Sequence, residues 1–472
     1  MLDEALIKAR SDESAHLLDE MSGQGVRFAQ MEIPDINGTM RGKIVWLKKA
    51  LAAYGTGLST AVMVFRSADE LSETAFTSVE AGLPKMLALP DYATLVRQPW
   101  KGDTAAIICD LVMEDGSPCP MHGRQMLKSA VARLDALGLE ARATIEFEVY
   151  IYQADDDLVR SKQFRRLKTF GRDWDCYSIA RDPSFEPLAK EFLDRMAGVG
   201  VEIEAFHTEL GHGMYEFMLA PKPVLEAADD AARAKLYFKQ LCIEHGLVAS
   251  FMPVIHIGTG DSATGSHHNL SLWRDGANAL WDAEAGALSR LGRHFAGGIL
   301  DTMPDFHVLF RPWVNSYRRM DRWLFTPENA SWALDNHSAA LRIVHGAYPA
   351  KLTRMEHRVS GGDVNFHITM AAILLGGLQG LENETDPGPY PEPDKIDDPR
   401  FEPLARNLAD AAAVFKASDR ARATFGDAFV DHFAQLKEDE WRDFTEWAAT
   451  NDVDLTVHAV TDWEFEHYFV WA

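Results

Sequence analysis

The sequence predicts an α+β protein in which a small β-rich domain precedes a larger domain of helices and short strands. Short apolar runs broken by turns dominate the first 112 residues, helical periodicity recurs beyond them, and charged residues alternate with apolar ones inside several strand-like segments. The chain has 472 residues, 47% of them hydrophobic, which is enough for a large core and more than one domain.

The first domain is expected to begin with a helix over residues 3–22. The turn signal Asp-Ile-Asn-Gly at 35–38 then separates two strand-like segments, and AAIICDLVM is a further strand. Because Ser117-Pro118-Cys119-Pro120 breaks the pattern, we expect an N-terminal domain of residues 1–112 and a second domain of residues 113–472.

The second domain alternates helices with short strands. Helices are expected over 126–139, 224–246, 286–303 and 403–447. The segment 382–399 is acidic and rich in proline, which predicts a surface loop.

Composition excludes some functions. The net charge of −24 argues against nucleic-acid binding, which needs a basic surface, and suits divalent metals or cationic small molecules, although it also simply favours solubility. Four cysteines without a CxxC motif indicate a reduced, cytoplasmic protein. We expect no membrane segment, because the most apolar run, residues 370–381, is too short to span a bilayer, and no signal-peptide core is present.

The most informative pattern is a charge at every second position of apolar strands. In ARATIEFEVYIY, Glu146 and Glu148 share one face while Ile145, Phe147 and Val149 share the other. One such strand alone would equally fit an ordinary half-exposed strand.

The pattern recurs in segments far apart in the chain. The residues on the polar faces of these segments are Glu216 in MYEFMLA, His267, Asn269 and Ser271 in SHHNLSLW, Arg354, Glu356 and Arg358 in LTRMEHRV, Asn315, Tyr317 and Arg319 in NSYRRM, and Arg342 in AALRIV. If these faces converge, the crowded carboxylates need a cation, and glutamates with one histidine suit Mg²⁺ or Mn²⁺. Arginines beside them suit phosphates and carboxylates. The combination predicts metal-assisted phosphoryl transfer.

Two other features carry little functional signal. The glycine-rich segment 258–265 lacks both the Gly-Lys-[Ser/Thr] ending of a P-loop and the GxGxxG spacing, so it is not interpreted as a nucleotide loop. His212 and His268 are interpreted as structural or solvent-facing.

The ordered motifs identify a resemblance to a known family. E-F-E, H-T-E-L-G-x-G-x-Y-E, F-M-P, G-S-H, N-S-Y-R-R, D-N-x-S, L-R-I and R-M-E-H-R resemble the glutamine synthetase superfamily in its own order, over about residues 33 to 382. The resemblance implies a β-grasp-like N-terminal domain and a catalytic domain with a curved antiparallel sheet flanked by helices. It also implies a homo-oligomer of stacked hexameric rings, commonly a dodecamer, with active sites between subunits.

The resemblance further implies a role for individual residues. One metal site would contain Glu148, Glu209 and Glu216, and a second Glu146, His267 and Glu356. Arg342 and Arg354 would contact ATP phosphates, with Lys351, Ser271, Asn269 and Glu204 near the nucleotide. Arg319 would bind the α-carboxylate of L-glutamate, and Arg358 the γ-carboxylate being phosphorylated. Asp35 would reach a neighbouring subunit's site as the base, lining the amine pocket with Tyr177 and Glu209.

Several positions depart from ordinary glutamine synthetases. Phe325 stands where they carry a flap glutamate, and Met214 replaces a glutamine, so together with Trp323 these residues would form an amine pocket with apolar walls. Ser262 and Ala263 replace an Asn-Gly pair near the glutamate amino group, Asn269 replaces a histidine, and His337 replaces an arginine.

The leading hypothesis is an ATP-dependent ligase that joins glutamate to an organic amine through a γ-glutamyl phosphate. Asp35, Tyr177 and the acidic chain suit a polyamine, whereas Phe325, Met214 and Trp323 suit an alkyl or aromatic amine, and both remain open. The alternatives are ordinary glutamine synthesis from ammonia and a catalytically silent structural or regulatory protein of the same fold.

Overall fold

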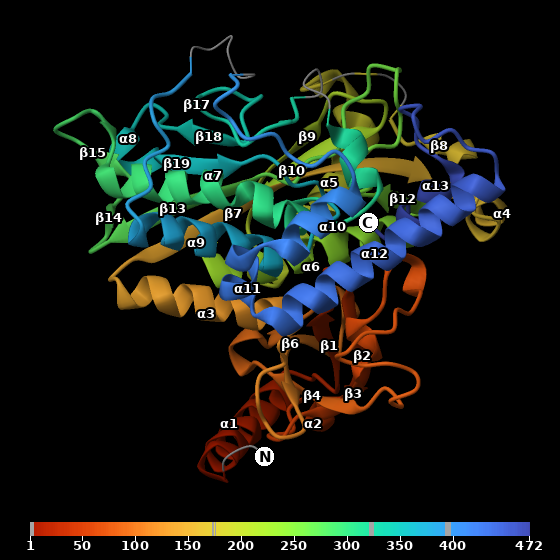
Figure 1. Ribbon diagram of the computed structural model, residues 1–472. Coiled ribbons are helices and arrows are strands. Elements are labelled where there is room, and N and C mark those ends of the chain that lie inside the picture. The colour runs from red at the N-terminus through yellow and green to blue at the C-terminus, as the bar shows by residue number, and fades with distance from the viewer. Residues whose placement is uncertain (1–3, 172–173, 175, 321–324, 392–397) are drawn as a thin grey trace.

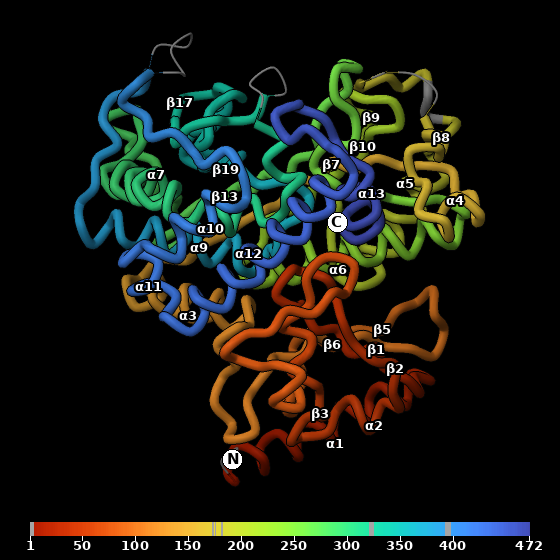
Figure 2. The backbone as a smooth tube through the Cα atoms, turned by 45° about the vertical axis from the view of Figure 1, so that its right-hand side comes forward, coloured from red at the N-terminus to blue at the C-terminus, as the bar shows by residue number. Residues whose placement is uncertain are grey.

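The fold consists of a small sheet and a large sheet, each with its own helices. The computed structural model describes residues 4–171, 174, 176–320, 325–391 and 398–472. The small N-terminal part protrudes from the larger remainder of the chain (Figures 1 and 2). The predicted α+β class is confirmed.

The N-terminal sheet has six strands in the order β2-β1-β6-β4-β3, with β5 paired to β6. The elements of this part are α1 (Glu4–Gly23), β1 (Phe28–Pro34), β2 (Met40–Trp46), α2 (Leu47–Ala50), β3 (Thr56–Ser59), β4 (Lys85–Pro90), β5 (Val96–Arg97) and β6 (Thr104–Met113). The helix expected over 3–22 and the turn expected at 35–38 are both present, and that turn joins the antiparallel strands β1 and β2.

The large sheet has eleven strands in the order β17-β18-β19-β13-β7-β10-β9, and β8, β11 and β12 also pair with β7, as β14 does with β13. The strands of this part are β7 (Glu140–Gln153), β8 (Lys168–Thr169), β9 (Ile203–Thr208), β10 (Met214–Leu219), β11 (Lys222–Pro223), β12 (Leu247–Ser250), β13 (His268–Arg274), β14 (Ala277–Asn278), β17 (Trp332–Leu334), β18 (Leu341–Val344) and β19 (Arg354–His357), with the separate hairpin β15 (Trp281–Asp282) and β16 (Ala287–Leu288). Most of the pairs are antiparallel, and β7 lies at the centre.

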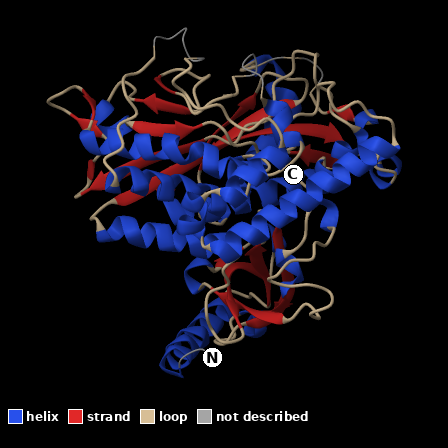
Figure 3. Ribbon diagram, viewed as in Figure 1, coloured by secondary structure: helices blue, strands red, loops and turns tan. Residues whose placement is uncertain are grey.

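Helices cover one side of the large sheet (Figure 3). The helices of this part are α3 (Gly123–Ala136), α4 (Asp156–Arg160), α5 (Asp182–Gly198), α6 (Val224–Glu244), α7 (Arg290–Phe310), α8 (Pro349–Leu352), α9 (Phe366–Glu382), α10 (Leu408–Ala417), α11 (Asp419–Phe425), α12 (Asp427–Thr450) and α13 (Asp462–Tyr468). The apolar run at 370–381 lies in α9 and is almost entirely buried. Within the described residues, no helix is long and apolar enough to cross a membrane.

Three expectations about local structure were wrong in detail. The segment NSYRRM is a short 3₁₀ helix over Asn315–Arg319, because the Asn315 amide bonds the backbone of Val254 on both sides and ends the strand-like alternation. The helix expected over 286–303 is α7, which begins after its cap Ser289 and runs on to Phe310. The helix expected over 403–447 is three helices, separated at Ser418 and at Gly426.

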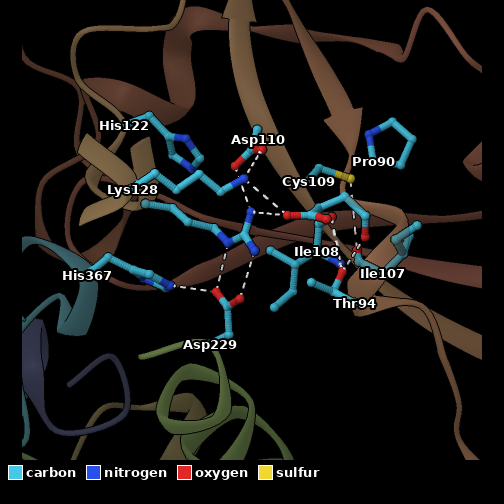
Figure 4. A network of polar contacts seen from close by, with 12 residues as sticks. Pro90, Thr94, Ile107, Ile108, Cys109, Asp110, His122, Lys128, Asp229 and His367 are labelled. Atoms are coloured by element: carbon cyan, nitrogen blue, oxygen red, sulfur yellow. Dashed lines mark hydrogen bonds and ion pairs between the residues drawn. The ribbon is translucent and has the colours of Figure 1, made fainter. Parts of the chain in front are cut away.

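A buried ionic network joins the N-terminal part to helices of the larger part (Figure 4). Arg124 of α3 binds Asp229 of α6 through two hydrogen bonds of 2.8 Å, and its third nitrogen lies 2.8 Å from both Asp91 and Asp110, which belong to the N-terminal part. His367 of α9 completes the network at 2.8 Å from Asp229. The N-terminal part is therefore fixed to the helices that support the large sheet.

Candidate active site

The polar faces of the large sheet meet around one cavity of about 400 Å³. Its lining includes all six predicted metal ligands together with three arginines and two exposed aromatic residues. The lining residues are Glu146, Glu148, Tyr177, Glu209, Leu210, Glu216, Met218, Ser262, Ala263, His267, Arg319, Phe325, His337, Arg342, Glu356 and Arg358. The convergence of the polar faces is thus confirmed for the strands that carry the carboxylates.

Strand register brings these residues together. Glu216 of β10 lies opposite Glu148 of β7, and Glu356 of β19 lies opposite both Arg342 of β18 and Asn269 of β13. Side chains at paired positions of neighbouring strands point to the same face. Glu146 and Arg358, which are 212 positions apart in the chain, therefore line one cavity.

The first acidic group contains Glu146, His267 and Glu356, as the sequence predicted. The His267 Nδ1 atom lies 3.2 Å from a Glu146 oxygen and 3.6 Å from a Glu356 oxygen. Asn269 donates to the other Glu146 oxygen at 2.9 Å, which orients that carboxylate. One imidazole nitrogen and two carboxylates within this distance of one another can hold a divalent cation.

The second group contains a residue that sequence reasoning missed. This group consists of Glu209, Glu216 and His207, and the Nε2 atom of His207 lies 3.7 Å from a Glu216 oxygen. The Nδ1 atom of His207 is 3.0 Å from the Thr208 carbonyl, and the Tyr177 ring lies tilted against the imidazole with the ring centroids 4.4 Å apart. The signal was present in F-H-T-E, where His207 and Glu209 are two residues apart and share a face at the end of β9.

Glu148 adjoins this second group but is bound differently. Its carboxylate accepts a hydrogen bond from the backbone N–H of Gly265. Burial, and then the charge of Glu216, raises the pKa of Glu148 to about 8, and the same two causes raise the pKa of Glu209. These carboxylates therefore repel one another, and a cation would relieve that repulsion, so the donor set and its electrostatics both fit divalent metal ions.

Three arginines also line the cavity. Arg342 donates to Glu356 at 2.9 Å, and Arg358 donates to the other oxygen of Glu356 and to the His337 carbonyl at 2.7 Å. Arg319 is buried and bonds the carbonyls of Val359 and Ser360 at 2.9 Å each. Burial lowers the pKa of Arg319 to about 10, which leaves it charged at neutral pH. Anionic groups of a substrate would thus meet fixed guanidinium groups.

The other predicted nucleotide contacts do not line the cavity. Arg354 donates to Asn269 at 2.9 Å, next to the first acidic group. Ser271 lies further along β13, where it accepts a hydrogen bond from Trp273 at 2.9 Å. Lys351 in α8 and Glu204 in β9 are exposed. Their predicted roles toward ATP remain predictions.

The predicted amine pocket is only partly assembled. Tyr177 and Phe325 both line the cavity, are 69% and 48% exposed, and have left-handed backbones with φ of 55° and 54°. Such conformations are costly for bulky residues and concentrate at functional sites. Met214 is buried in β10 outside the lining, whereas Met218 of the same strand lies within it, and Trp323 falls outside the described residues.

Asp35 lies away from the cavity of its own chain. Its side chain is fully buried in the turn between β1 and β2, where it accepts hydrogen bonds from the backbone of Asn37 and Thr39 at 2.9 Å and from Arg41 at 2.8 Å. Burial raises its pKa although Arg41 opposes that effect. The expected role of Asp35 in a neighbouring subunit's site remains a prediction.

Comparison with known proteins agrees with this geometry. Residues 120–468 match the family described as "Glutamine synthetase, catalytic domain". The chain is 32% identical to a glutamate–isopropylamine ligase of Pseudomonas sp, over 85% of this chain and 89% of that protein. It is 30% identical to the gamma-glutamylethanolamide synthetase GlnA4 of Streptomyces coelicolor, over 93% of this chain and 92% of that protein.

A solved complex of GmaS with ADP has a similar fold. The TM-score is 0.76 at 26% identity, and the alignment covers 92% of this chain and 98% of that one. The chain therefore belongs to the glutamine synthetase family. Within that family it is an ATP-dependent ligase that forms C–N bonds, and it is similar to members that join glutamate to amines.

Proposed function

We propose that this protein ligates the γ-carboxylate of L-glutamate to a small organic amine, with ATP as the second substrate and γ-glutamyl phosphate as the intermediate. The observation that carries the proposal is the cavity itself. It combines two acidic groups, three arginines and the exposed ring of Phe325 at the position where an ammonia-using enzyme of the family has a glutamate.

The two acidic groups would hold Mg²⁺ or Mn²⁺. Glu146, His267 and Glu356 would bind one cation, and Glu209 and Glu216, with Glu148 beside them, would bind another. A divalent cation bound there would neutralise phosphate charge and polarise the γ-phosphate toward attack.

The arginines would orient the anionic reactants. Arg342 lies beside Glu356, where a phosphate bridging to the metal group would meet it. Arg358 would hold the γ-carboxylate during phosphorylation, and the buried Arg319 would hold the α-carboxylate. Because these groups are fixed by backbone carbonyls and by Glu356, they would need little rearrangement when the substrate binds.

The amine would occupy the part of the cavity near Tyr177, Leu210 and Phe325. An aromatic ring and aliphatic side chains stabilise a bound amine by burying its carbon skeleton. Ammonia has no carbon skeleton, so these side chains would not stabilise it in this way. The similarity to ligases named for isopropylamine and ethanolamide supports this assignment. We further propose a cytoplasmic homo-oligomer of stacked rings, with Asp35 and the N-terminal domain of residues 1–112 near a neighbouring site.

Phosphate release from ATP tests the proposal. Purified protein would be incubated with glutamate, Mg²⁺ and each of ammonia, putrescine, spermidine, isopropylamine and aniline, and the γ-glutamyl product would be identified by mass spectrometry. We expect turnover with at least one organic amine to exceed turnover with ammonia. Turnover with ammonia alone would show an ordinary glutamine synthetase, a candidate that the relatives of that name keep open. No turnover with any amine would favour a silent protein.

A further inference from the structure

Two adjacent loops form one wall of the cavity, and both follow strands of the large sheet. The first loop carries Glu209 and Leu210 after β9, and the second carries Ser262 and Ala263 within the glycine-rich segment 258–265. The second loop has little regular structure of its own, so its position depends on contacts with its neighbours.

A buried carboxylate ties the second loop to the first. One oxygen of Asp261 accepts hydrogen bonds from the His212 ring Nδ1 at 2.7 Å and from the His212 backbone N–H at 3.0 Å. Its other oxygen accepts from the Thr259 hydroxyl at 2.8 Å. Burial alone would raise the pKa of Asp261, but the hydrogen bonds from His212 and Thr259 together lower it below its usual value.

The contacts continue directly into the cavity wall. The Ser262 N–H donates to the Leu210 carbonyl at 2.7 Å, and the Tyr150 hydroxyl donates to the Ser262 carbonyl at 2.7 Å. Three positions after Ser262, the backbone N–H of Gly265 donates to the Glu148 carboxylate. The pair of His212 and Asp261 therefore lies immediately behind the residues that face the substrate.

We propose that His212 and Asp261 are positioning residues that hold the loop 258–263 in the conformation that binds the acid substrate. This inference rests on the proposed function, because it takes that substrate to be glutamate. The side chain of His212 is about half exposed and forms its hydrogen bond with Asp261, not with a described residue of the two acidic groups. Any effect of His212 on the site therefore passes through Asp261.

Substitutions at His212 separate a specific hydrogen bond from a general structural effect. His212→Asn keeps a donor near the position of Nδ1, whereas His212→Leu removes it, and the exposed side chain makes either variant tolerable for folding. The first readout is hydrogen exchange of the amides at 258–263 without substrates. We expect exchange about fivefold faster in His212→Leu than in the wild type, which is the factor that one ordinary hydrogen bond supplies, and near wild type in His212→Asn.

The second readout is steady-state kinetics with the amine that gives the fastest turnover. We expect the KM for glutamate to rise about fivefold in His212→Leu, with the KM for ATP unchanged and with recovery in His212→Asn. Unchanged exchange in His212→Leu, or an equal rise in both KM values, would overturn the inference. If the wild type turns over no amine, the proposed function fails, while hydrogen exchange still decides whether the pair holds the loop.

Discussion

Glu216 lies directly opposite Glu148 in the antiparallel register of β10 and β7, so two carboxylates lie side by side in the lining of the cavity. No packing requirement places two acidic side chains together in a largely buried position. Burial and mutual repulsion raise the pKa of Glu148 to about 8. A cation bound here would stabilise the ionised form of both carboxylates.

Replacing one ligand of the first acidic group should abolish activity without unfolding the protein. Glu356→Gln keeps the side-chain volume but removes the charge that holds His267, Arg342 and Arg358. We expect phosphate release to fall by about 100-fold or more, and Mn²⁺ binding measured by calorimetry to lose one site. Glu140→Gln, on an exposed position of β7, is the matched control. Retained activity in Glu356→Gln would show that the metal assignment is wrong.

Gly265 should tolerate no side chain. A Cβ atom there would lie 2.7 Å from the His267 ring and about 3 Å from Arg319 and Glu148, so one group from each part of the site would have to move. We expect Gly265→Ala to weaken metal binding and activity by about tenfold or more, since small displacements of catalytic groups are costly. A Cβ atom at Gly57 would have no neighbouring heavy atom within 4 Å, so the control variant Gly57→Ala should behave as the wild type.

The residue at position 325 should decide which amines react. We expect Phe325→Glu to raise the ratio of ammonia to organic-amine turnover by about tenfold, because a carboxylate attracts ammonium and the apolar contact is lost. Phe325→Leu keeps an apolar surface and should leave the ratio near that of the wild type. An unchanged ratio in Phe325→Glu would remove the main argument for an organic amine. The measurement is kcat/KM for each amine.

The network around Arg124 should stabilise the junction between the two sheets. Arg124→Met would leave Asp229 without an arginine partner, and Asp91 and Asp110 with Lys128 alone. Removing one partner of a buried ionic group costs about 3–5 kcal/mol. Arg133→Met breaks an exposed pair with Glu382 and should cost less than about 1 kcal/mol. Urea unfolding of both variants measures the difference, and similar losses would contradict the interpretation of the network.

Acid should destabilise the protein partly through His122. Burial lowers the pKa of His122 to about 3, whereas a histidine in the unfolded chain titrates near pH 6.5. The unfolded state therefore binds one more proton between these values, so the stability that the neutral ring contributes is complete above about pH 6.5 and is lost as the pH falls toward 3.

A substitution isolates this contribution. His122 Nδ1 accepts a hydrogen bond from the Leu111 N–H at 3.3 Å, and in His122→Asn the amide oxygen can take that place. We expect the unfolding free energy of the variant to fall less steeply than that of the wild type over this range, by about 1.4 kcal/mol per pH unit. Equal slopes would show that His122 is protonated in the folded state.

Much of the site was predictable from the sequence because strands have a fixed period of two. The alternation of Glu146 and Glu148 with apolar residues in β7 placed both on one face, and the motif order added Glu209, Glu216, His267 and Glu356. All six predicted ligands line the cavity. The same reasoning failed for NSYRRM, because a period-two pattern cannot show that the Asn315 side chain will bond a distant backbone segment and convert the strand into a 3₁₀ helix.

The sequence by itself determined which faces are polar, which chemistry those residues suit and which family the motifs resemble. Only the tertiary structure decided which polar residues meet, because strand register and loop contacts join segments that are distant in the chain. It placed His207 between Glu209 and Glu216, left Met214 behind the cavity wall, buried Asp35 within its own turn and paired His212 with Asp261. These are relationships between side chains on different elements, and no local pattern specifies them.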